Sequence, residues 1–80
     1  MTSQVSLAFI GFGEAGLAIA ETLSASGLAT GMRAHDIKLT DHDHEIAAAM
    51  RARIEGAGVT ACDTARDAVE EAEIVICVVT

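Results

Sequence analysis

The residues best suited to chemistry are the glycines of one short run, which follows the apolar segment Val5–Ile10. Gly11 can take a tight turn out of a strand without the steric cost of a Cβ atom. Gly13 allows the backbone to approach an anion closely, and Gly16 allows a following helix to pack against the strand. Free N–H groups at the start of that helix, with the positive end of its dipole, favour a pyrophosphate. The residues predicted to form this phosphate cradle are Gly11, Phe12, Gly13, Glu14, Ala15 and Gly16.

A carboxylate at a defined distance strengthens this interpretation. Asp36 closes the segment Met32–Asp36 and lies 20 positions after Gly16. It can accept hydrogen bonds from the 2′- and 3′-hydroxyls of an adenosine ribose. A strand, a glycine run, a helix and then an acid are typical of a dinucleotide-binding unit, whereas glycines alone also occur in plain turns and in other nucleotide sites. Asp36 repels a 2′-phosphate, which favours NAD as the cofactor, but Lys38 can partly offset that charge and tolerate NADP.

Length and composition set limits on the fold and the partners. Eighty residues allow one small domain, with room for about one of the two mononucleotide halves of a dinucleotide-binding domain. The chain is 51% hydrophobic and has no proline, which suits helices packed closely on a sheet. Its formal net charge of −7 argues against nucleic acid and anionic membranes as partners. No apolar run reaches the ~20 residues that span a bilayer and no basic leader precedes Val5–Ile10, so a cytoplasmic protein is expected.

Hydrophobic periodicity predicts four strands and three helices in alternation. The first helix is expected to bury Gly16, Ile19, Ala20 and Leu23, and the second to bury Ile46, Ala47, Met50 and Ile54. The predicted elements are strand Val5–Ile10, helix Glu14–Ser26 with Gly27 as its stop, strand Met32–Asp36, a helix from Thr40 or Asp41 to about Glu55, strand Val59–Ala61, a helix from Asp63 or Thr64 to about Ala72, and strand Ile74–Val79.

The order β-α-β-α-β-α-β predicts an α/β fold with a Rossmann-type parallel sheet of strand order 3-2-1-4, an incomplete half of a dinucleotide-binding domain. The first two helices should lie on one face of the sheet and the short third helix on the other. The outer edge of Ile74–Val79 should then be exposed. We therefore expect residues 1–80 to be the N-terminal part of a longer NAD(P)-binding domain, or to form a homo-oligomer through the 74–79 edge strand.

From Leu7 onward the chain resembles the NAD(P)-binding domain of the β-hydroxyacid dehydrogenases, which include 6-phosphogluconate dehydrogenase and 3-hydroxyisobutyrate dehydrogenase. The similar segments are AFIGFGEAGLAIAETLSASG, RAHD and AEIVICVVT. The resemblance implies hydride transfer between a nicotinamide cofactor and a hydroxyacid or a phosphorylated sugar acid such as 6-phosphogluconate. It also implies that Val79 and Thr80 meet the nicotinamide ribose. Ala15 stands where the commoner family string has methionine.

The resemblance covers nearly all of this chain but about a quarter to a third of such an enzyme. The family's catalytic lysine and its substrate-binding glycine motif lie beyond residue 80, so no catalytic residue is assigned and the chain alone is not expected to transfer hydride. Two other functions stay open. One is a fragment of an S-adenosylmethionine-dependent methyltransferase, whose usual G-x-G-x-G string is broken by Ala15, and the other is a non-catalytic nucleotide-binding or assembly module.

The remaining titratable residues are interpreted as structural. His42 and His44 would point about 200° apart on a helix, so the acidic segment Asp41–Glu45 is expected to be a solvated helix start and no metal site is predicted. His35 is expected to fill a strand position and Cys77 to be a small core residue. Cys62 and Cys77 should lie about 14 Å apart on opposite sheet edges, which excludes a disulfide between them.

Overall fold

The computed structural model describes residues 5–29 and 31–78, and the fold confirms the predicted architecture. Within these residues, four strands form a parallel sheet in the order β3-β2-β1-β4. The elements in chain order are β1 (Leu7–Ile10), α1 (Glu14–Ser26), β2 (Arg33–His35), the 3₁₀ helix η1 (Ile37–Thr40), α2 (His44–Gly56), β3 (Thr60–Ala61), α3 (Ala65–Val69) and β4 (Ile74–Cys77).

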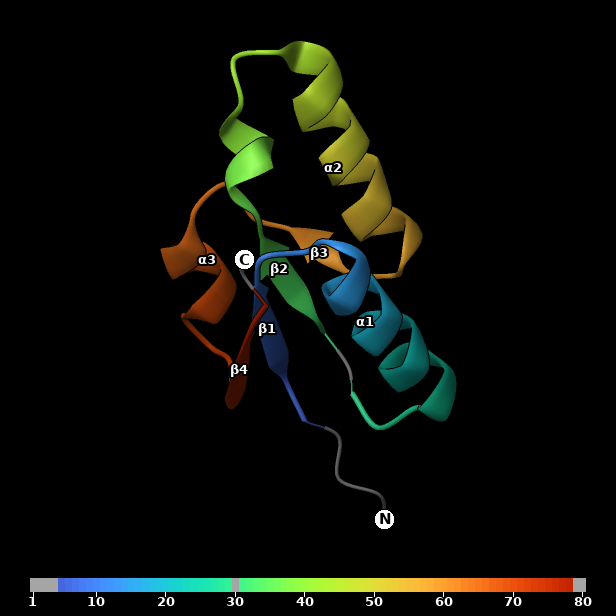
Figure 1. The fold of residues 1–80 in the computed structure, drawn as a ribbon. Helices are drawn as coiled ribbons and strands as arrows, with labels where there is room; N and C mark the ends of the chain where they lie inside the picture. The colour runs from blue at the N-terminus through green and yellow to red at the C-terminus, as the bar shows by residue number, and fades with distance from the viewer. Residues whose placement is uncertain (1–4, 30, 79–80) are drawn as a thin grey trace.

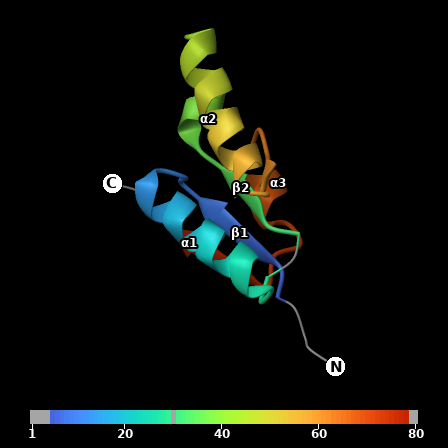
Figure 2. The same cartoon turned by 90° about the vertical axis from the view of Figure 1, so that its right-hand side faces the viewer.

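The helices cover the two faces of the sheet unequally, as the topology predicted. Helices α1 and α2 lie on one side of the sheet and the short α3 lies on the other (Figure 1). The view turned by 90° separates the same layers, with α1 in front of β1 and α3 behind β2 (Figure 2). The core lies on the α1 and α2 side, where Phe9, Phe12 and Ile54 are fully buried. The Phe9 and Phe12 rings meet edge to face, with centroids 5.4 Å apart.

Local capping explains where the helices begin and end. Gly27 adopts a left-handed conformation with φ 72° and ends α1 as predicted. Helix α2 begins at His44, later than the predicted Thr40 or Asp41, because the Asp43 carboxylate accepts a hydrogen bond from the Glu45 N–H at 2.9 Å and caps the helix there. The residues before it form η1 instead. Helix α3 ends at Val69, earlier than the predicted Ala72.

Several apolar side chains predicted to be buried are exposed, because no described element covers them. Ile19 on α1 and Ile46 on α2 are 36% and 41% exposed. The prediction of Cys77 as a core residue is wrong: β4 is an edge strand, and Cys77 is exposed. The predicted exposure of this edge is confirmed by Ile74 and Val75, at 49% and 44%. Among the described residues, no helix is both long and apolar enough to cross a bilayer.

Candidate dinucleotide site

The glycine run forms a tight turn between β1 and α1. Gly11 has φ 90°, a conformation that favours glycine, and its N–H donates to the His35 carbonyl at 2.8 Å. A Cβ atom at Gly16 would lie 3.1 Å from the Gly11 carbonyl oxygen and 3.5 Å from the Phe12 ring. Gly16 therefore permits α1 to approach the turn after β1 closely, whereas its spacing predicted close packing of the helix on the strand itself.

Gly13 lies at the open side of the predicted phosphate cradle. It is the N-cap residue of α1, it makes no side-chain cap, and a Cβ atom placed on it would meet nothing within 4 Å. The first bond of the helix runs from the Leu17 N–H to the Gly13 carbonyl at 3.0 Å. The N–H groups of Glu14 and Ala15, which are exposed, consequently have no acceptor within the helix. Open space beside free N–H donors at a helix N-terminus fits a pyrophosphate.

Asp36 joins the glycine run to the end of β2. One carboxylate oxygen, Oδ2, accepts from the Phe12 N–H at 2.8 Å, and the other, Oδ1, accepts from the Lys38 N–H at 2.9 Å. The same residue caps η1. The sequence motif predicted that the Asp36 carboxylate binds the ribose hydroxyls. The structure adds that the same carboxylate binds the glycine loop through the Phe12 N–H group. Phe12 was predicted as a cofactor contact, but its side chain is fully buried, so that only its backbone lies at the cradle.

A cavity of about 270 Å³ connects these parts. It lies at the carboxyl ends of β1, β2 and β4. The strand order reverses here, because β1 connects to β2 on one side while β3 crosses back to β4 on the other side of β1, and this is the usual ligand position in such sheets. Helix α2 extends beyond these strand ends and forms one wall (Figure 1). The lining residues are Gly11, Gly13, Asp36, Ile37, Lys38, Met50, Arg53 and Val78.

The structure brings three residues to this cavity that the motif did not reveal. Ile37 is 81% exposed beside Asp36. Met50 and Arg53 come from α2, and their three-residue spacing places both on one side of that helix. That spacing was the available signal, but Met50 was interpreted only as a core residue and Arg53 was not predicted to be a site residue. The predicted contacts Val79 and Thr80 lie outside the described residues.

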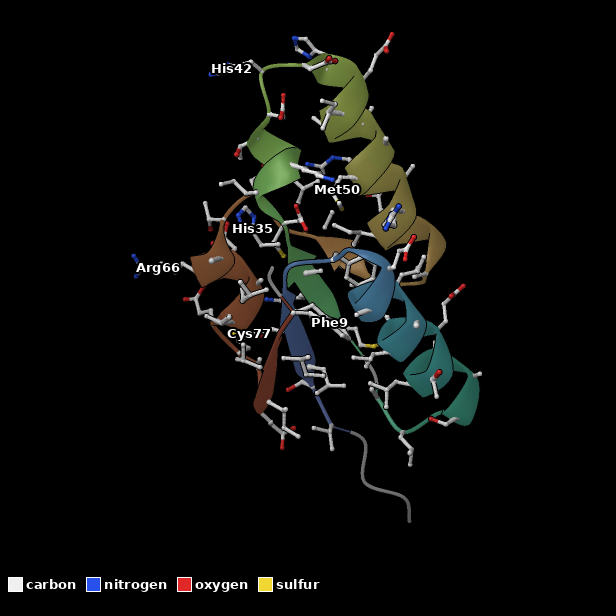
Figure 3. The ribbon with its side chains drawn as sticks, in the orientation of Figure 1. Phe9, His35, His42, Met50, Arg66 and Cys77 are labelled. Atoms are coloured by element: carbon white, nitrogen blue, oxygen red, sulfur yellow. The ribbon has the colours of Figure 1, made fainter. Side chains whose placement is uncertain are left out.

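The histidines and cysteines lie apart from the cradle or serve the fold. His35 donates from Nδ1 to the Cys62 carbonyl at 2.9 Å, which supports its predicted structural role. Cys62 and Cys77 are both free thiols, and burial raises the pKa of Cys62. His42 lies at the far tip of the molecule, remote from His35 and Cys77 (Figure 3). In the described part of the chain, no three or more His, Cys, Asp or Glu side chains cluster as metal ligands.

Comparison with known proteins agrees with this geometry. A solved structure, titled as a conserved hypothetical protein from Sinorhizobium meliloti 1021, is similar with a TM-score of 0.84 and 32% sequence identity. The match covers 99% of this chain and 25% of that chain, so the chain spans a quarter of the length of this relative. A search of curated proteins found no match. The family model described as "NADP oxidoreductase coenzyme F420-dependent" matches residues 6–80. The chain therefore belongs to this oxidoreductase family and forms an NAD(P)-binding domain of Rossmann type.

Proposed function

We propose that the chain is the cofactor-binding portion of an enzyme that transfers hydride between a nicotinamide dinucleotide and a hydroxyacid or a phosphorylated sugar acid such as 6-phosphogluconate. The observation that carries the cofactor part is the set of free N–H donors at the start of α1, beside open space at Gly13 and across the cavity from Asp36. The substrate class rests on the resemblance of three segments of the chain to β-hydroxyacid dehydrogenases.

The residues of the chain divide the work of binding. The N–H groups of Glu14 and Ala15 donate to the pyrophosphate, and the dipole of α1 adds to this attraction. Asp36 has about four acceptor positions on its two oxygens, and backbone N–H groups use two of them. The other positions accept the ribose hydroxyls. When bound, the cofactor supplies the hydride chemistry, and the cradle fixes where its pyrophosphate lies.

The rest of the reaction requires groups that we do not assign to this chain. No residue of the cavity combines a nucleophile or proton donor with a partner that activates it, among the residues that the structure describes. We propose that a further part of a longer enzyme supplies the groups that bind the substrate and the groups that catalyse the reaction. The family description names coenzyme F420, so F420 belongs beside hydroxyacids among the hydride partners to be tried with that enzyme.

Replacing Asp36 by Ala tests the ribose contact. The change removes a carboxylate that accepts ribose hydroxyls and repels a 2′-phosphate, so we expect the Kd for NAD to rise about tenfold while that for NADP rises less. Isothermal titration of both dinucleotides into folded protein measures the ratio of the two constants. An unaltered ratio would show that Asp36 does not read the ribose.

The stability of Asp36→Ala has to be measured beside its affinity, because Asp36 also holds backbone groups of the fold. Loss of the carboxylate leaves the N–H groups of Phe12 and Lys38 without their acceptor, which should cost about 1–3 kcal/mol of unfolding free energy. Urea unfolding of the variant measures this cost, and the titration is interpreted only at temperatures where the variant is folded. Asp63→Ala serves as a control, because Asp63 is exposed and pairs with Arg51 away from the cavity.

A further inference from the structure

We propose that the chain forms a dimer in which the outer edges of two β4 strands pair in antiparallel orientation about a two-fold axis, so that two four-stranded sheets become one. The dimer does not depend on the proposed function, because it is built from the backbone of β4 and not from the cavity. The sequence predicted a homo-oligomer through this strand as one alternative, and the backbone of the fold specifies its register.

The two edges of the sheet differ in how they are protected. The β3 edge is two residues long, and the ion pair of Arg51 with Asp63, at 2.8 Å, joins α2 to the segment that follows it. The β4 edge, Ile74–Cys77, is four residues long and lies at the outer side of β1 (Figure 1). Helix α3 packs mainly on β1 and β2, so Ile74 and Val75 are left exposed, at 49% and 44%. A long apolar edge without a charged residue or a proline readily pairs with another strand.

The backbone of β4 leaves a regular set of hydrogen-bonding groups on its outer side. The N–H groups of Ile74 and Val78 donate to carbonyl groups of the neighbouring β1 segment, at 3.3 and 2.9 Å. Because backbone groups alternate in direction along a strand, the N–H and C=O groups of Val75 and Cys77 point away from β1. Among the residues that the structure describes, no strand pairs with β4 on that side. The edge therefore presents two donors and two acceptors at the spacing that a second strand requires.

A second copy of β4 fits this edge when Val75 of one copy lies opposite Cys77 of the other. The two residues then exchange two hydrogen bonds, and the two-fold axis repeats the exchange, which gives four bonds across the interface. Ile76 lies opposite its own copy at the axis, and Ile74 lies opposite Val78. No charged side chain lies within this pairing, and on each face of the joined sheet apolar residues meet.

The acidic residue next to β4 does not oppose this arrangement. Glu73 precedes the strand, and its carboxylate accepts from the N–H and the hydroxyl of Ser6, at 3.3 and 3.4 Å, so that it is held toward β1. In the antiparallel pair the two Glu73 residues lie about 20 Å apart along the strands, which exceeds the Debye length of about 8 Å in physiological salt. A parallel pair would bring them together. The net charge of −7 therefore favours the antiparallel orientation for two copies of this chain.

The contact is small, which sets the concentration at which it forms. Pairing of residues 74–78 in two copies buries less than the ~1,200 Å² of a standard stable interface, so we expect a Kd of about 100 µM. At low micromolar concentration the chain is then monomeric, and Cys77 is open to reagents. Assembly stops at the dimer, because the edge that is left, β3, is only two residues long and packs beside α2.

Sedimentation equilibrium of the folded 80-residue chain, from about 10 µM to about 1 mM, measures the association. Val75→Pro removes an outward N–H that bonds to no other described strand, and edge strands tolerate proline at such a position. Val75→Lys keeps this donor and places a charge on the edge, so it decides the question if the proline variant does not fold. Each substitution should raise the Kd of the dimer about tenfold or more.

Ile46→Lys is the matched control. Ile46 is 41% exposed, close to the value for Val75, but it lies on α2 and not on the sheet edge. The control makes the same kind of change and should leave the Kd of the dimer within about twofold. Circular dichroism establishes that each variant is folded. Amide hydrogen exchange locates the contact, because the N–H groups of Val75 and Cys77 should exchange more slowly as the concentration rises, whereas that of Val78, already bonded to β1, should not change.

A folded chain that sediments at the mass of one copy over the whole range overturns the dimer, as expected if a further segment of a longer enzyme occupies this edge. Association that neither Val75 variant weakens, or that Ile46→Lys weakens equally, overturns the assignment of the contact to β4. Growth beyond the dimer contradicts the closed two-fold pairing. A dimer that is weakened by the folded Val75 variants and kept by Ile46→Lys, with slowed exchange at Val75 and Cys77, supports the proposal.

Discussion

The sheet carries a cavity at each end, and the two cavities differ in how their polar groups are used. The cavity at the amino ends of the strands is the larger, at about 340 Å³, and it is lined by Ser6, Leu7, Gly31, Arg33, Ala68, Glu71 and Ala72. Its polar groups bind one another. The Ser6 hydroxyl donates to the Glu71 carbonyl at 3.1 Å and accepts from the Glu73 N–H at 3.2 Å, while Arg33 pairs with the Glu71 carboxylate.

The cavity at the carboxyl ends is smaller, at about 270 Å³, but its donors are free. The N–H groups at the start of α1 have no helical acceptor, and Lys38 and Arg53 have no carboxylate partner among the described residues. Polar groups that already satisfy one another gain little from a ligand, whereas free donors exchange water for one. Unpaired donors, rather than cavity volume, are therefore the reason for proposing the carboxyl end as the binding end of this sheet.

The substitution Gly13→Asp tests the difference between the two cavities with the largest expected effect. An aspartate at this position places a side chain and a negative charge where the pyrophosphate would lie, and we expect the Kd for NAD and NADP to rise by at least about 100-fold, or about 2.7 kcal/mol. Folding should not suffer. Gly13 has φ −78° and open space around it, and aspartate is a favoured N-cap residue.

Gly56→Asp is the matched control for this substitution. A Cβ atom at Gly56 would also meet nothing within 4 Å, but Gly56 lies at the end of α2 and does not line the cavity. The control adds the same charge and should leave dinucleotide binding unchanged. Equal affinities in Gly13→Asp and the unsubstituted protein would rule out the cradle.

A substitution in the cavity at the amino ends of the strands should lower the free energy of unfolding and leave dinucleotide binding unchanged. Ser6→Ala removes a hydroxyl that links β1 to the segment before β4, and we expect a loss of about 1 kcal/mol of unfolding free energy. Urea denaturation measures the loss, and titration with NADP should give the constant of the unsubstituted protein. A marked fall in NADP affinity without unfolding would mean that the amino-end cavity contributes to the site.

A smaller effect is expected at the two cysteines. Burial raises the pKa of the half-buried Cys62, so less thiolate is present there at a given pH, whereas Cys77 is exposed on the edge strand. Iodoacetamide at about pH 8 should modify Cys77 several times faster than Cys62, as followed by mass spectrometry of peptides. The rate at Cys62 should rise as the pH increases through the ordinary thiol range and beyond. Equal rates at the two thiols would contradict the exposed position of β4.

Sequence reasoning predicted the elements that depend on local chemistry. The bounds of α1 follow from the glycine turn before it and from Gly27 after it, and the strand order follows from the right-handed connections. The start of α2 was harder, because Asp41 and Asp43 can each bind a nearby N–H group and only the structure shows which one caps the helix.

The site was predictable to the extent that it is built from consecutive residues. Gly11, Gly13 and Gly16 lie as the motif requires. Arg53 could not be identified, because its place in the cavity depends on how α2 packs beside η1, 15 residues after Lys38 in the chain. The second function of Asp36, holding the Phe12 N–H, likewise depends on the distance between β1 and β2 and not on any local pattern.

The most direct test of dinucleotide binding is a calorimetric titration of the folded chain with NADP and with NAD, using S-adenosylmethionine as the comparison ligand. We predict saturable heat with both dinucleotides and none with S-adenosylmethionine. Saturable binding of S-adenosylmethionine alone would indicate a methyltransferase-type site in place of a dinucleotide cradle. No heat from any of the three ligands, in a sample shown to be folded by circular dichroism, would contradict the claim that the glycine run binds a dinucleotide.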